Sequence, residues 1–464
     1  MDDKVEICMH AQPLINESLQ EFQLVFRHTQ QPNEKRSSGV QQTIPQRQPT
    51  MGSLHKTHKP SDERLPMTPE YVQRNFMQYL TNYERTEITN YRQVWYLGKK
   101  TANKGTTMKP QLSNFGFDTE GGLYRSVVDH PLAYRFQIMS VIGKGFSGEV
   151  LKCLDHKTKQ FVAIKVFRNR DSVLKMAESE MKVLKALQEC DRTKSANIVY
   201  MKEHFSFRNH LCIVFDLYDG DLHKVMKNRE THPVTEEELK SYTIDILTCL
   251  QLLKKKHIVH GDLKPENILI HKKNDETHSA VTDFGGSFFT IDRNKPPVYT
   301  LNYMSPELLL GKRCRMPIDM WSLGCIIAEI HLSQRLFKGK DSHSIFSSIM
   351  QLLGVPSEEL LADSPEKNLY FDSKGKPRRM EHIEKSRTSV AKKLKSKDDS
   401  FINFIEGCLE YDPKKRMTPE KALCHPWISK NSEPSLSSDS RKKMPTLLRR
   451  ERKEPLRQRP INNN

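Results

Sequence analysis

The sequence predicts an α+β protein of two lobes, with a β-rich first lobe, a helical second lobe and a cleft between them. From about residue 136, short β-branched and apolar segments bounded by glycines indicate strands. After Thr235, apolar residues recur at helical spacing, and this pattern dominates to about residue 428. Strands followed by helices are typical of an α+β fold whose site lies where the two parts meet.

A disordered region and a small ordered element are expected before the first lobe. Residues 1–64 are rich in Gln, Pro, His and Ser and show no sustained apolar period, as disordered segments do. Thr68 followed by Pro69 then marks the start of a helix, and the polar residues 99–115 resemble a linker. The apolar residues at helical spacing after this start are Val72, Phe76, Tyr79, Leu80 and Tyr83.

Four regions follow from these changes in composition. They are a disordered N-terminal region (1–64), an accessory region with its linker (65–115), a main domain (136–428) and a basic, disordered C-terminal tail (429–464). The 464 residues suffice for one large domain with extensions, or for two modest domains. The longest apolar stretches fall far below the roughly 20 residues that a membrane helix needs, and the acidic start of the chain does not resemble a secretory signal. We therefore expect no membrane span.

The elements of the main domain can be placed in order. Strands are expected from about residue 136, over 161–166, which is β-branched and apolar, and over 210–217, which is a continuous apolar run. A capping box, Thr235 with Glu238, then begins a long helix. The rest of the domain is expected to be mostly helical.

The net charge of +17 comes mainly from two segments. Residues 372–397 contain ten basic and three acidic residues, and residues 441–459 contain nine basic and two acidic, so each carries +7 and together they supply 14 of the 17 charges. These segments are either a solvated insert and tail or a patch for nuclear import or an acidic partner. A nucleic-acid-binding role is not favoured, because the tail lacks aromatic residues for base stacking.

The nine cysteines indicate a reducing compartment. Their number is odd, they are scattered, and no C-x-x-C pair is present. This pattern favours reduced thiols over a disulfide framework or a zinc site. The expected location is therefore the cytoplasm, the nucleus or both.

A glycine-rich segment follows the first expected strand. Residues 143–150 read G-x-G-x-x-G-x-V, and three glycines allow backbone N–H groups to approach phosphate oxygens closely. Alone, the pattern is also compatible with an ordinary turn or a dinucleotide-binding loop. A dinucleotide fold requires a helix directly afterwards, whereas a second strand is expected here. The segment is therefore predicted to be a hairpin flap over a nucleotide.

A lysine and a glutamate are expected to pair across the first lobe. Lys165 ends the apolar strand segment Val162-Ala163-Ile164-Lys165, where burial is costly without an anion. The alternative is a lysine that reaches the surface. In the next helix, Glu180 interrupts an apolar stripe and so requires a cation, whereas Glu178 lies off the stripe and is the weaker candidate. The pair would direct Lys165 towards the α- and β-phosphates of ATP.

The segment His260-Gly261-Asp262-Leu263-Lys264-Pro265-Glu266-Asn267, followed by Asp283-Phe284-Gly285, carries the chemistry of phosphoryl transfer. Asp262 is the candidate base for the substrate hydroxyl, and Lys264 can neutralise charge on the γ-phosphate. Asn267 and Asp283 supply the oxygen ligands that Mg²⁺ prefers. Each residue alone has a structural alternative, such as a turn aspartate or a loop lysine. Their conjunction in this order predicts a protein kinase.

Residues of about 136–428 resemble a eukaryotic protein kinase domain, with a β-rich N-lobe and a helical C-lobe. They are most similar to the dual-specificity tyrosine-regulated kinases, second class, of the CMGC group. The similarity is also carried by residues 208–213, 316–325 and 412–419, and residues 65–98 resemble the accessory region of that class.

The resemblance implies several roles. Phe215 falls at the gatekeeper position, with the adenine-facing hinge over 216–218. Asp319 would brace the catalytic loop, and Glu307 would pair with Arg416. With the glycine loop and the lysine pair, the residues expected to bind ATP are Ile142, Gly143, Lys144, Gly145, Phe146, Ser147, Gly148, Val150, Ala163, Lys165, Glu180, Phe215, Asp216, Leu217 and Tyr218.

The sequence departs from the resembled family in its regulatory positions. Gly261 stands where most kinases carry an arginine that binds a phosphate on the activation loop. The resembled family also lacks this arginine, commonly carries cysteine there, and relies on a self-phosphorylated tyrosine instead. The family has a Y-x-Y pair in the activation loop and modifies its second tyrosine, whereas this chain has Leu301 in that place and a segment about four residues shorter. Met304 replaces the arginine that helps to set proline-directed preference. Thr300 is then expected near Asp262 and Lys264.

The sequence therefore predicts an ATP- and Mg²⁺-dependent serine/threonine kinase that acts on protein hydroxyls. Tyrosine autophosphorylation at Tyr299 stays open, with little phosphate expected there. The alternative is a pseudokinase or scaffold that binds nucleotide and partners without useful turnover. All recognised catalytic positions are filled, which disfavours this alternative, whereas the shortened loop keeps it open. The sequence makes no prediction of oligomeric state.

Overall fold

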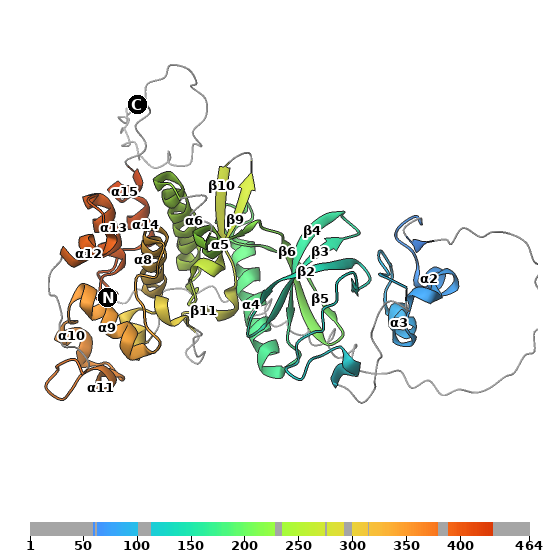
Figure 1. The fold of residues 1–464 in the computed structure, drawn as a ribbon, viewed down its shortest axis with the longest axis horizontal. Helices are drawn as coiled ribbons and strands as arrows, with labels where there is room; N and C mark the ends of the chain where they lie inside the picture. Colours follow the sequence, from blue (N-terminus) through green and yellow to red (C-terminus); the bar gives the residue numbers. More distant parts are fainter. Residues whose placement is uncertain are drawn as a thin grey trace, which may run out of the picture.

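The computed structural model describes residues 59–60, 63–100, 113–227, 234–273, 276–291, 299–313, 315–378 and 388–429. The regions predicted to be disordered, 1–64 and 429–464, lie almost entirely outside these residues. The described chain forms two lobes, with a small helical element at the end of the first lobe that is remote from the second (Figure 1). The predicted two-lobed α+β architecture is confirmed.

The first lobe is built on an antiparallel six-stranded sheet in the order β1-β2-β3-β4-β6-β5. Alternate side chains of β3 are buried, which is the pattern of a strand with one face on a core. The apolar face includes Ile138, Leu151 and Ile164, all at most 1% exposed. The strands are β1 (Pro131–Leu132), β2 (Phe136–Lys144), β3 (Gly148–Asp155), β4 (Gln160–Phe167), β5 (Met201–Phe207) and β6 (His210–Asp216).

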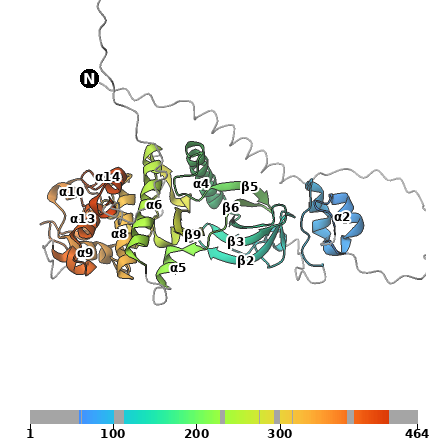
Figure 2. The ribbon, with the colours of Figure 1, turned by 90° about the horizontal axis from the view of Figure 1, so that it is seen from above.

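One long helix, α4 (Asp171–Cys190), completes the first lobe. Figure 2 shows it at the junction of the lobes, between the sheet and α6 of the second lobe. Val173, Leu184 and Leu187 are buried along one face, and Glu180 lies among them with only 2% exposure. The stripe predicted from the sequence is therefore buried against the rest of the lobe, and it carries one carboxylate inward.

The accessory element consists of short helices and not of one continuous helix. Thr68 caps the first helix, as expected, by accepting a hydrogen bond from the N–H of Tyr71 at 3.2 Å. The helical pattern predicted from Val72 to Tyr83 is interrupted at Phe76, whose φ of −130° is not helical, and Thr81 with Glu84 forms a second capping box. The segments are α2 (Pro69–Asn75), η2 (Met77–Tyr79), α3 (Asn82–Glu87) and η3 (Ile88–Asn90).

Arg208, in the turn between β5 and β6, ties the accessory element to the sheet. Its guanidinium donates to Glu87 at 2.8 and 2.9 Å and lies 3.8 Å from the ring centroid of Phe117. Asn114 also donates to the carbonyl of Arg208 at 2.7 Å. Asn114, near the end of the predicted linker, therefore contacts the sheet lobe. Residues 101–112 lie outside the described part of the chain.

The second lobe is mostly helical, as predicted, and its first long helix is α6 (Glu236–Lys255), which begins at the predicted capping box of Thr235 and Glu238. Helix α8 (Pro317–Leu332) runs through the interior with nearly every side chain buried. The other helices are α5 (Leu222–Lys227), α7 (Pro306–Leu309), α9 (Ser342–Leu353), α10 (Glu358–Ala362), α11 (Lys367–Tyr370), α12 (Thr388–Leu394), α13 (Asp399–Cys408), α14 (Pro419–Leu423) and α15 (Pro426–Ser429).

Five short strands at the junction of the lobes were not predicted from the sequence. They have at most six residues each and form two small antiparallel sheets, β10-β9-β7 and β11-β8. Such short segments show too little periodicity to be recognised, yet they flank the segments that contain Asp262 and Asp283. They are β7 (Gly220–Asp221), β8 (Ile258–Val259), β9 (Ile268–Lys273), β10 (Glu276–Val281) and β11 (Phe288–Phe289).

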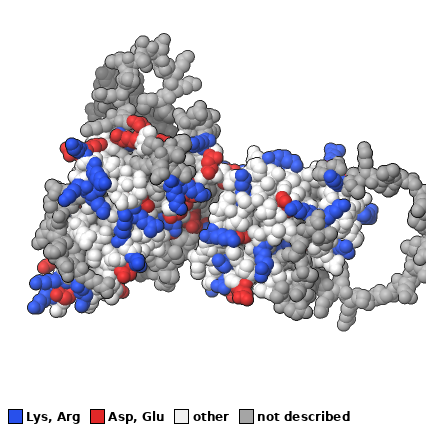
Figure 3. Space-filling model, viewed as in Figure 1, with Lys and Arg blue, Asp and Glu red and all other residues white. Residues whose placement is uncertain are grey.

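The surface of the described residues shows no single basic face in the view of Figure 3. Lys and Arg side chains are spread over both lobes, with Asp and Glu side chains among them. The basic segment 441–459 lies outside the described residues, as does part of 372–397. Among the helices that the structure describes, none is both long and apolar enough to cross a membrane.

Candidate active site

The glycine-rich segment is the turn of the β2–β3 hairpin, as the sequence predicted. The N–H of Gly145 donates to the carbonyl of Gly148 at 2.8 Å, which closes the turn. A Cβ at Gly148 would lie 2.1 Å from the carbonyl oxygen of Val166, so only glycine is accommodated there. Phe146, at the tip, is 76% exposed. Ile142 is also exposed, near the end of β2.

The sheet register brings the other candidate ATP-binding residues together. Val150 of β3 pairs with Lys165 of β4, and Ala163 of β4 pairs with Phe215 of β6. The strand β6 ends at Asp216, so the predicted hinge, residues 216–218, leaves the sheet at the junction of the lobes. The candidates from the glycine loop, from β4 and from the hinge therefore lie on neighbouring parts of one sheet.

Lys165 forms the expected pair with Glu180 and also contacts Asp283. Its Nζ lies 2.8 Å from both carboxylate oxygens of Glu180 and 2.8 Å from Oδ1 of Asp283. Burial alone would lower the pKa of Lys165, but the adjacent carboxylates of Asp283 and Glu180 outweigh burial and raise it. The charge of Lys165 lowers the pKa of Asp283 to about 2, although burial alone would raise it. Lys165 and Asp283 are therefore charged at neutral pH.

The loop that contains Asp262 is held by a buried carboxylate. Asp319 accepts hydrogen bonds from the backbone N–H groups of His260 at 2.8 Å and Gly261 at 3.0 Å, the bracing role that the resemblance implied. Burial raises the pKa of Asp319. Asn267 donates from Nδ2 to the backbone carbonyl of Asp262 at 2.8 Å, which leaves its Oδ1 as the acceptor atom of that side chain.

Asp262 and Lys264 meet the hydroxyl of Thr300. Lys264 Nζ lies 2.6 Å from Asp262 Oδ2, and the Thr300 hydroxyl donates to Asp262 Oδ1 at 2.6 Å. Lys264 Nζ also donates to Thr300 Oγ1 at 3.2 Å. The proximity of Thr300 to these two residues, expected from the sequence, is present in the structure. A hydroxyl therefore lies within hydrogen-bond distance of both a carboxylate and an ammonium group.

Gly261 has a conformation that disfavours side chains. Its φ is +81°, and a Cβ would lie 3.3 Å from the carbonyl oxygen of Gly286. Glycine adopts positive φ without the penalty that other residues incur. The sequence indicated only a regulatory meaning for this position, whereas the structure adds a conformational one.

The segment after Thr300 is fixed by hydrogen bonds that the sequence did not predict. The Tyr303 hydroxyl donates to Glu329 at 2.7 Å, and the Ser322 hydroxyl donates to the carbonyl of Tyr303 at 2.9 Å. Asn302 donates to the carbonyl of Phe337 at 3.1 Å. Residues 292–298, the preceding part of the activation segment, lie outside the described residues.

Glu307, at the end of the activation segment, is bound to the residues that precede α14. Arg416 donates to the two carboxylate oxygens of Glu307 at 2.7 and 2.9 Å, which is the bidentate geometry favoured by guanidinium and carboxylate. The resemblance implied this pair. Tyr299 is half-buried and packs against the apolar cluster of Val259, Phe288 and Ile318.

Three features of this site define the protein kinase class. They are the pair of Lys165 with Glu180 in the sheet lobe, and the loop of Asp262 and the segment of Asp283 at the lobe junction. A family model described as the protein kinase domain matches residues 136–428, and the chain belongs to this family. Within it, the chain belongs to the dual-specificity tyrosine-phosphorylation-regulated kinases of the CMGC group. It is an ATP-dependent protein serine/threonine kinase, and nothing in these similarities favours a pseudokinase.

Two relatives illustrate the similarity. The chain is 37% identical over 382 residues to dual specificity tyrosine-phosphorylation-regulated kinase 4 of Homo sapiens, covering 81% of this chain and 73% of the relative. It is 36% identical over 398 residues to kinase 3 of the same series from Rattus norvegicus, covering 81% of this chain and 67% of the relative. The similarity therefore extends well beyond the kinase domain itself.

Proposed function

We propose that the chain transfers the γ-phosphoryl group of ATP, with Mg²⁺, to serine and threonine hydroxyls of protein substrates through Asp262 and Lys264. The observation that carries this proposal is the position of the Thr300 hydroxyl, 2.6 Å from Asp262 Oδ1 and 3.2 Å from Lys264 Nζ. A substrate hydroxyl in this environment would donate its proton to the carboxylate, while the ammonium group would face the transferred phosphoryl oxygens.

The ATP-binding roles rest on the arrangement of the first lobe. The backbone N–H groups of the β2–β3 turn would cover the phosphates, and Lys165 would contact the α- and β-phosphates while Glu180 holds it in place. Phe215 and the hinge, residues 216–218, would face adenine. The register of β4 with β3 and β6 supports this assignment, because it gathers these groups at one end of the sheet.

The donors at Asn267 and Asp283 fit Mg²⁺. The amide nitrogen of Asn267 donates to the carbonyl of Asp262, so the amide oxygen of Asn267 can face the ion. Lys165 lowers the pKa of the Asp283 carboxylate to about 2, so this carboxylate is ionised at neutral pH. No cluster of three or more His, Cys, Asp or Glu side chains suited to a metal is present among the described residues, so further ligands would be phosphate oxygens and water. Bound Mg²⁺ would neutralise charge on the β- and γ-phosphate oxygens.

The proposed roles are tested by phosphate transfer to a generic protein substrate. Asp262→Asn and Lys165→Met should each lower the rate, by roughly 10²- to 10⁴-fold for the base. Asp363→Asn, an exposed carboxylate at the end of α10, should leave it unchanged. Equal residual transfer in the wild type and in both active-site variants would contradict the proposal.

We also propose that the basic tail influences location. The nine basic residues of 441–459 would favour a nuclear pool beside a cytoplasmic one, by electrostatic recognition of an acidic import partner. Removal of residues 441–464 should lower the nuclear fraction measured by imaging. An unchanged distribution would leave the tail as a solvated segment without this role.

A further inference from the structure

Arg168, the residue after β4, holds the tip of the glycine-rich turn. Its guanidinium donates to the carbonyl of Phe146 at 2.8 Å and to that of Gly145 at 3.4 Å. It also donates to the carbonyl of Gly121, in the segment before β1, at 3.2 Å. Side-chain packing gives the tip little support, because Phe146 is 76% exposed and a Cβ at Gly145 would meet no atom within 4 Å. Arg168 therefore joins an exposed tip to a neighbouring segment of the chain.

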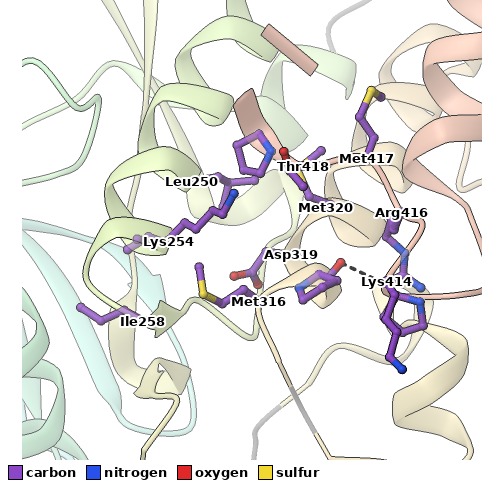
Figure 4. Close-up of a pocket in the computed structure, with 14 residues that line it drawn as sticks. Leu250, Lys254, Ile258, Met316, Asp319, Met320, Lys414, Arg416, Met417 and Thr418 are labelled. Carbon is purple, nitrogen blue, oxygen red and sulfur yellow. Dashed lines mark hydrogen bonds between the residues drawn. The ribbon is translucent and has the colours of Figure 1, made fainter. Parts of the chain in front are cut away.

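The partners of Arg168 are neutral, in contrast to those of Arg416. Arg416 is bound by the carboxylate of Glu307 at 2.7 Å and donates in addition to the carbonyl of Pro317 at 2.9 Å (Figure 4). No carboxylate among the described residues binds Arg168, whose acceptors are all backbone carbonyls. An ion pair therefore does not explain this arrangement. What the guanidinium fixes is the direction of peptide groups.

Two N–H groups of the turn are oriented by these bonds. The carbonyls of Gly145 and Phe146 share their peptide units with the N–H groups of Phe146 and Ser147. Both units are trans, so each N–H points opposite to the carbonyl of its own unit. Because both carbonyls face Arg168, both N–H groups point away from it. Neither N–H donates a hydrogen bond within the described part of the chain.

Arg168 lies on the face of the sheet opposite to Lys165. Its N–H donates to the carbonyl of Ser147 at 2.8 Å, which continues the pairing of β4 with β3, and side chains alternate between the two faces of a strand. Val166, two residues before Arg168, packs accordingly in the apolar cluster that contains Phe117. The N–H groups that point away from Arg168 therefore point to the side of the sheet where Lys165 lies.

The third acceptor of Arg168 belongs to a turn that is held by other bonds. The N–H of Asn169 donates to the carbonyl of Gly122 at 2.8 Å, and the side chain of Asn169 donates to Asp118 at 3.0 Å. These bonds fix the position of the neighbouring carbonyl of Gly121. Arg168 thus ties the glycine-rich turn to a point that does not depend on the turn itself.

We propose that Arg168 is a positioning residue for the nucleotide. Its guanidinium holds two carbonyls of the glycine-rich turn on the outer face of the sheet, so that the N–H groups of Phe146 and Ser147 are directed to phosphate oxygens of ATP. The proposal rests on the ATP-binding roles proposed above and deepens them. It assigns to the segment before the sheet, through Gly121, a part in binding the phosphates.

The test separates binding of the phosphates from binding of adenine. Calorimetric titrations of the full chain with adenosine and with a non-hydrolysable ATP analogue, in the presence of Mg²⁺, give the two affinities. In Arg168→Met, the affinity for the analogue should fall roughly tenfold, as the loss of a hydrogen bond to a charged oxygen predicts. The affinity for adenosine should not change. Arg168→Lys keeps the charge but lacks the planar fork that holds two acceptors, so it should lose most of the same affinity.

Arg170→Met is the matched control. It removes the same charge two residues later, from an exposed side chain that has no described bond to the turn. Because salt screens exposed charges, both affinities should stay within about twofold of the wild type.

Two results would overturn the role of Arg168. One is an equal loss of affinity for adenosine and for the analogue, which would show that Arg168 only supports the fold of the lobe. The other is an unchanged affinity for the analogue in Arg168→Lys, a variant that preserves charge and size and makes the test independent of the folding of Arg168→Met. A wild-type chain that binds the analogue no more tightly than adenosine would overturn the proposed ATP-binding roles, and this proposal with them.

Discussion

The two sides of the catalytic cleft are held by different interactions. On the ATP-facing side, the ammonium of Lys165 lies 2.8 Å from the carboxylates of Glu180 and Asp283. On the acceptor-facing side, neutral hydroxyl groups donate hydrogen bonds to carboxylates, from Thr300 to Asp262 and from Tyr303 to Glu329. One side is an ion-pair network, whereas the other combines a single ion pair, Lys264 with Asp262, with hydroxyl donors on fixed acceptors.

This difference separates chemistry from regulation. Lys165 and Glu180 are largely buried, so each of these charges depends on its partner. On the acceptor side, glycine stands at position 261 and methionine at position 304, so neither position supplies an arginine that could bind a phosphate. We therefore expect that the activity of the enzyme does not depend on a phosphate at Tyr299.

The largest effect is expected from Glu180→Gln. This change removes one charge of the ion-pair network and loosens the position of Lys165, so transfer should fall roughly 10²-fold, as misplacement of a reacting group predicts. Steady-state kinetics with a protein substrate would measure it. The matched control is Glu178→Gln, two residues earlier on α4 and outside the bonds of Lys165. Equal rates for the two variants would contradict the claim that Glu180 holds Lys165 in position on the ATP-facing side.

Tyr303→Phe should weaken the acceptor-facing side with a defined pH dependence. Loss of the hydroxyl leaves the buried carboxylate of Glu329 short of a donor, at a cost of about 1–3 kcal/mol in the free energy of unfolding. Burial raises the pKa of Glu329, and the bond from Tyr303 opposes that rise. The lost bond stabilises the ionised form, so the cost should be larger at pH 7 than at acidic pH, where Glu329 is protonated.

Chemical denaturation at both pH values would measure this cost. In a Glu329→Gln background, the effect of Tyr303→Phe should no longer vary with pH. A pH-independent cost in the presence of Glu329 would show that the bond between Tyr303 and the ionised Glu329 does not hold this segment.

Gly261→Ala should have the smallest effect of the three. A non-glycine residue at φ +81° costs about 1–2 kcal/mol, and the Gly286 carbonyl leaves little room for a Cβ. The free energy of unfolding should fall by this amount. Gly220→Ala is the control, because its Cβ would meet nothing closer than Lys224 at 3.9 Å. Equal stabilities would show that the backbone of the loop relaxes readily.

The ATP-facing side could be predicted from the sequence because its clues are local. Glu180 interrupts an apolar stripe at helical spacing, and Lys165 interrupts an apolar strand, so each buried charge indicates the need for a partner. The resulting bond joins residues only 15 positions apart. Thr235 and Glu238 similarly marked the start of α6.

The acceptor-facing side could be predicted only in part, because its bonds depend on the tertiary fold. Thr300 was placed near Asp262 through the pattern of its segment, but the bond from Tyr303 to Glu329 joins the activation segment to α8. Nothing local marks Glu329 as its acceptor. The tie from Arg208 to Glu87, across 121 positions, was missed for the same reason.

Independence from a phosphate at Tyr299 can be measured as the activity of the enzyme before and after treatment with a tyrosine phosphatase, with mass spectrometry to verify that Tyr299 is unmodified. Because hydrogen bonds of Thr300, Tyr303 and Ser322 hold the acceptor-facing side, kcat/KM for a protein substrate should be unchanged, and little phosphate should be found on Tyr299 at the start. A stoichiometric phosphate on Tyr299 whose removal lowers kcat/KM by about tenfold or more, a loss of at least 1.4 kcal/mol of transition-state stabilisation, would contradict it.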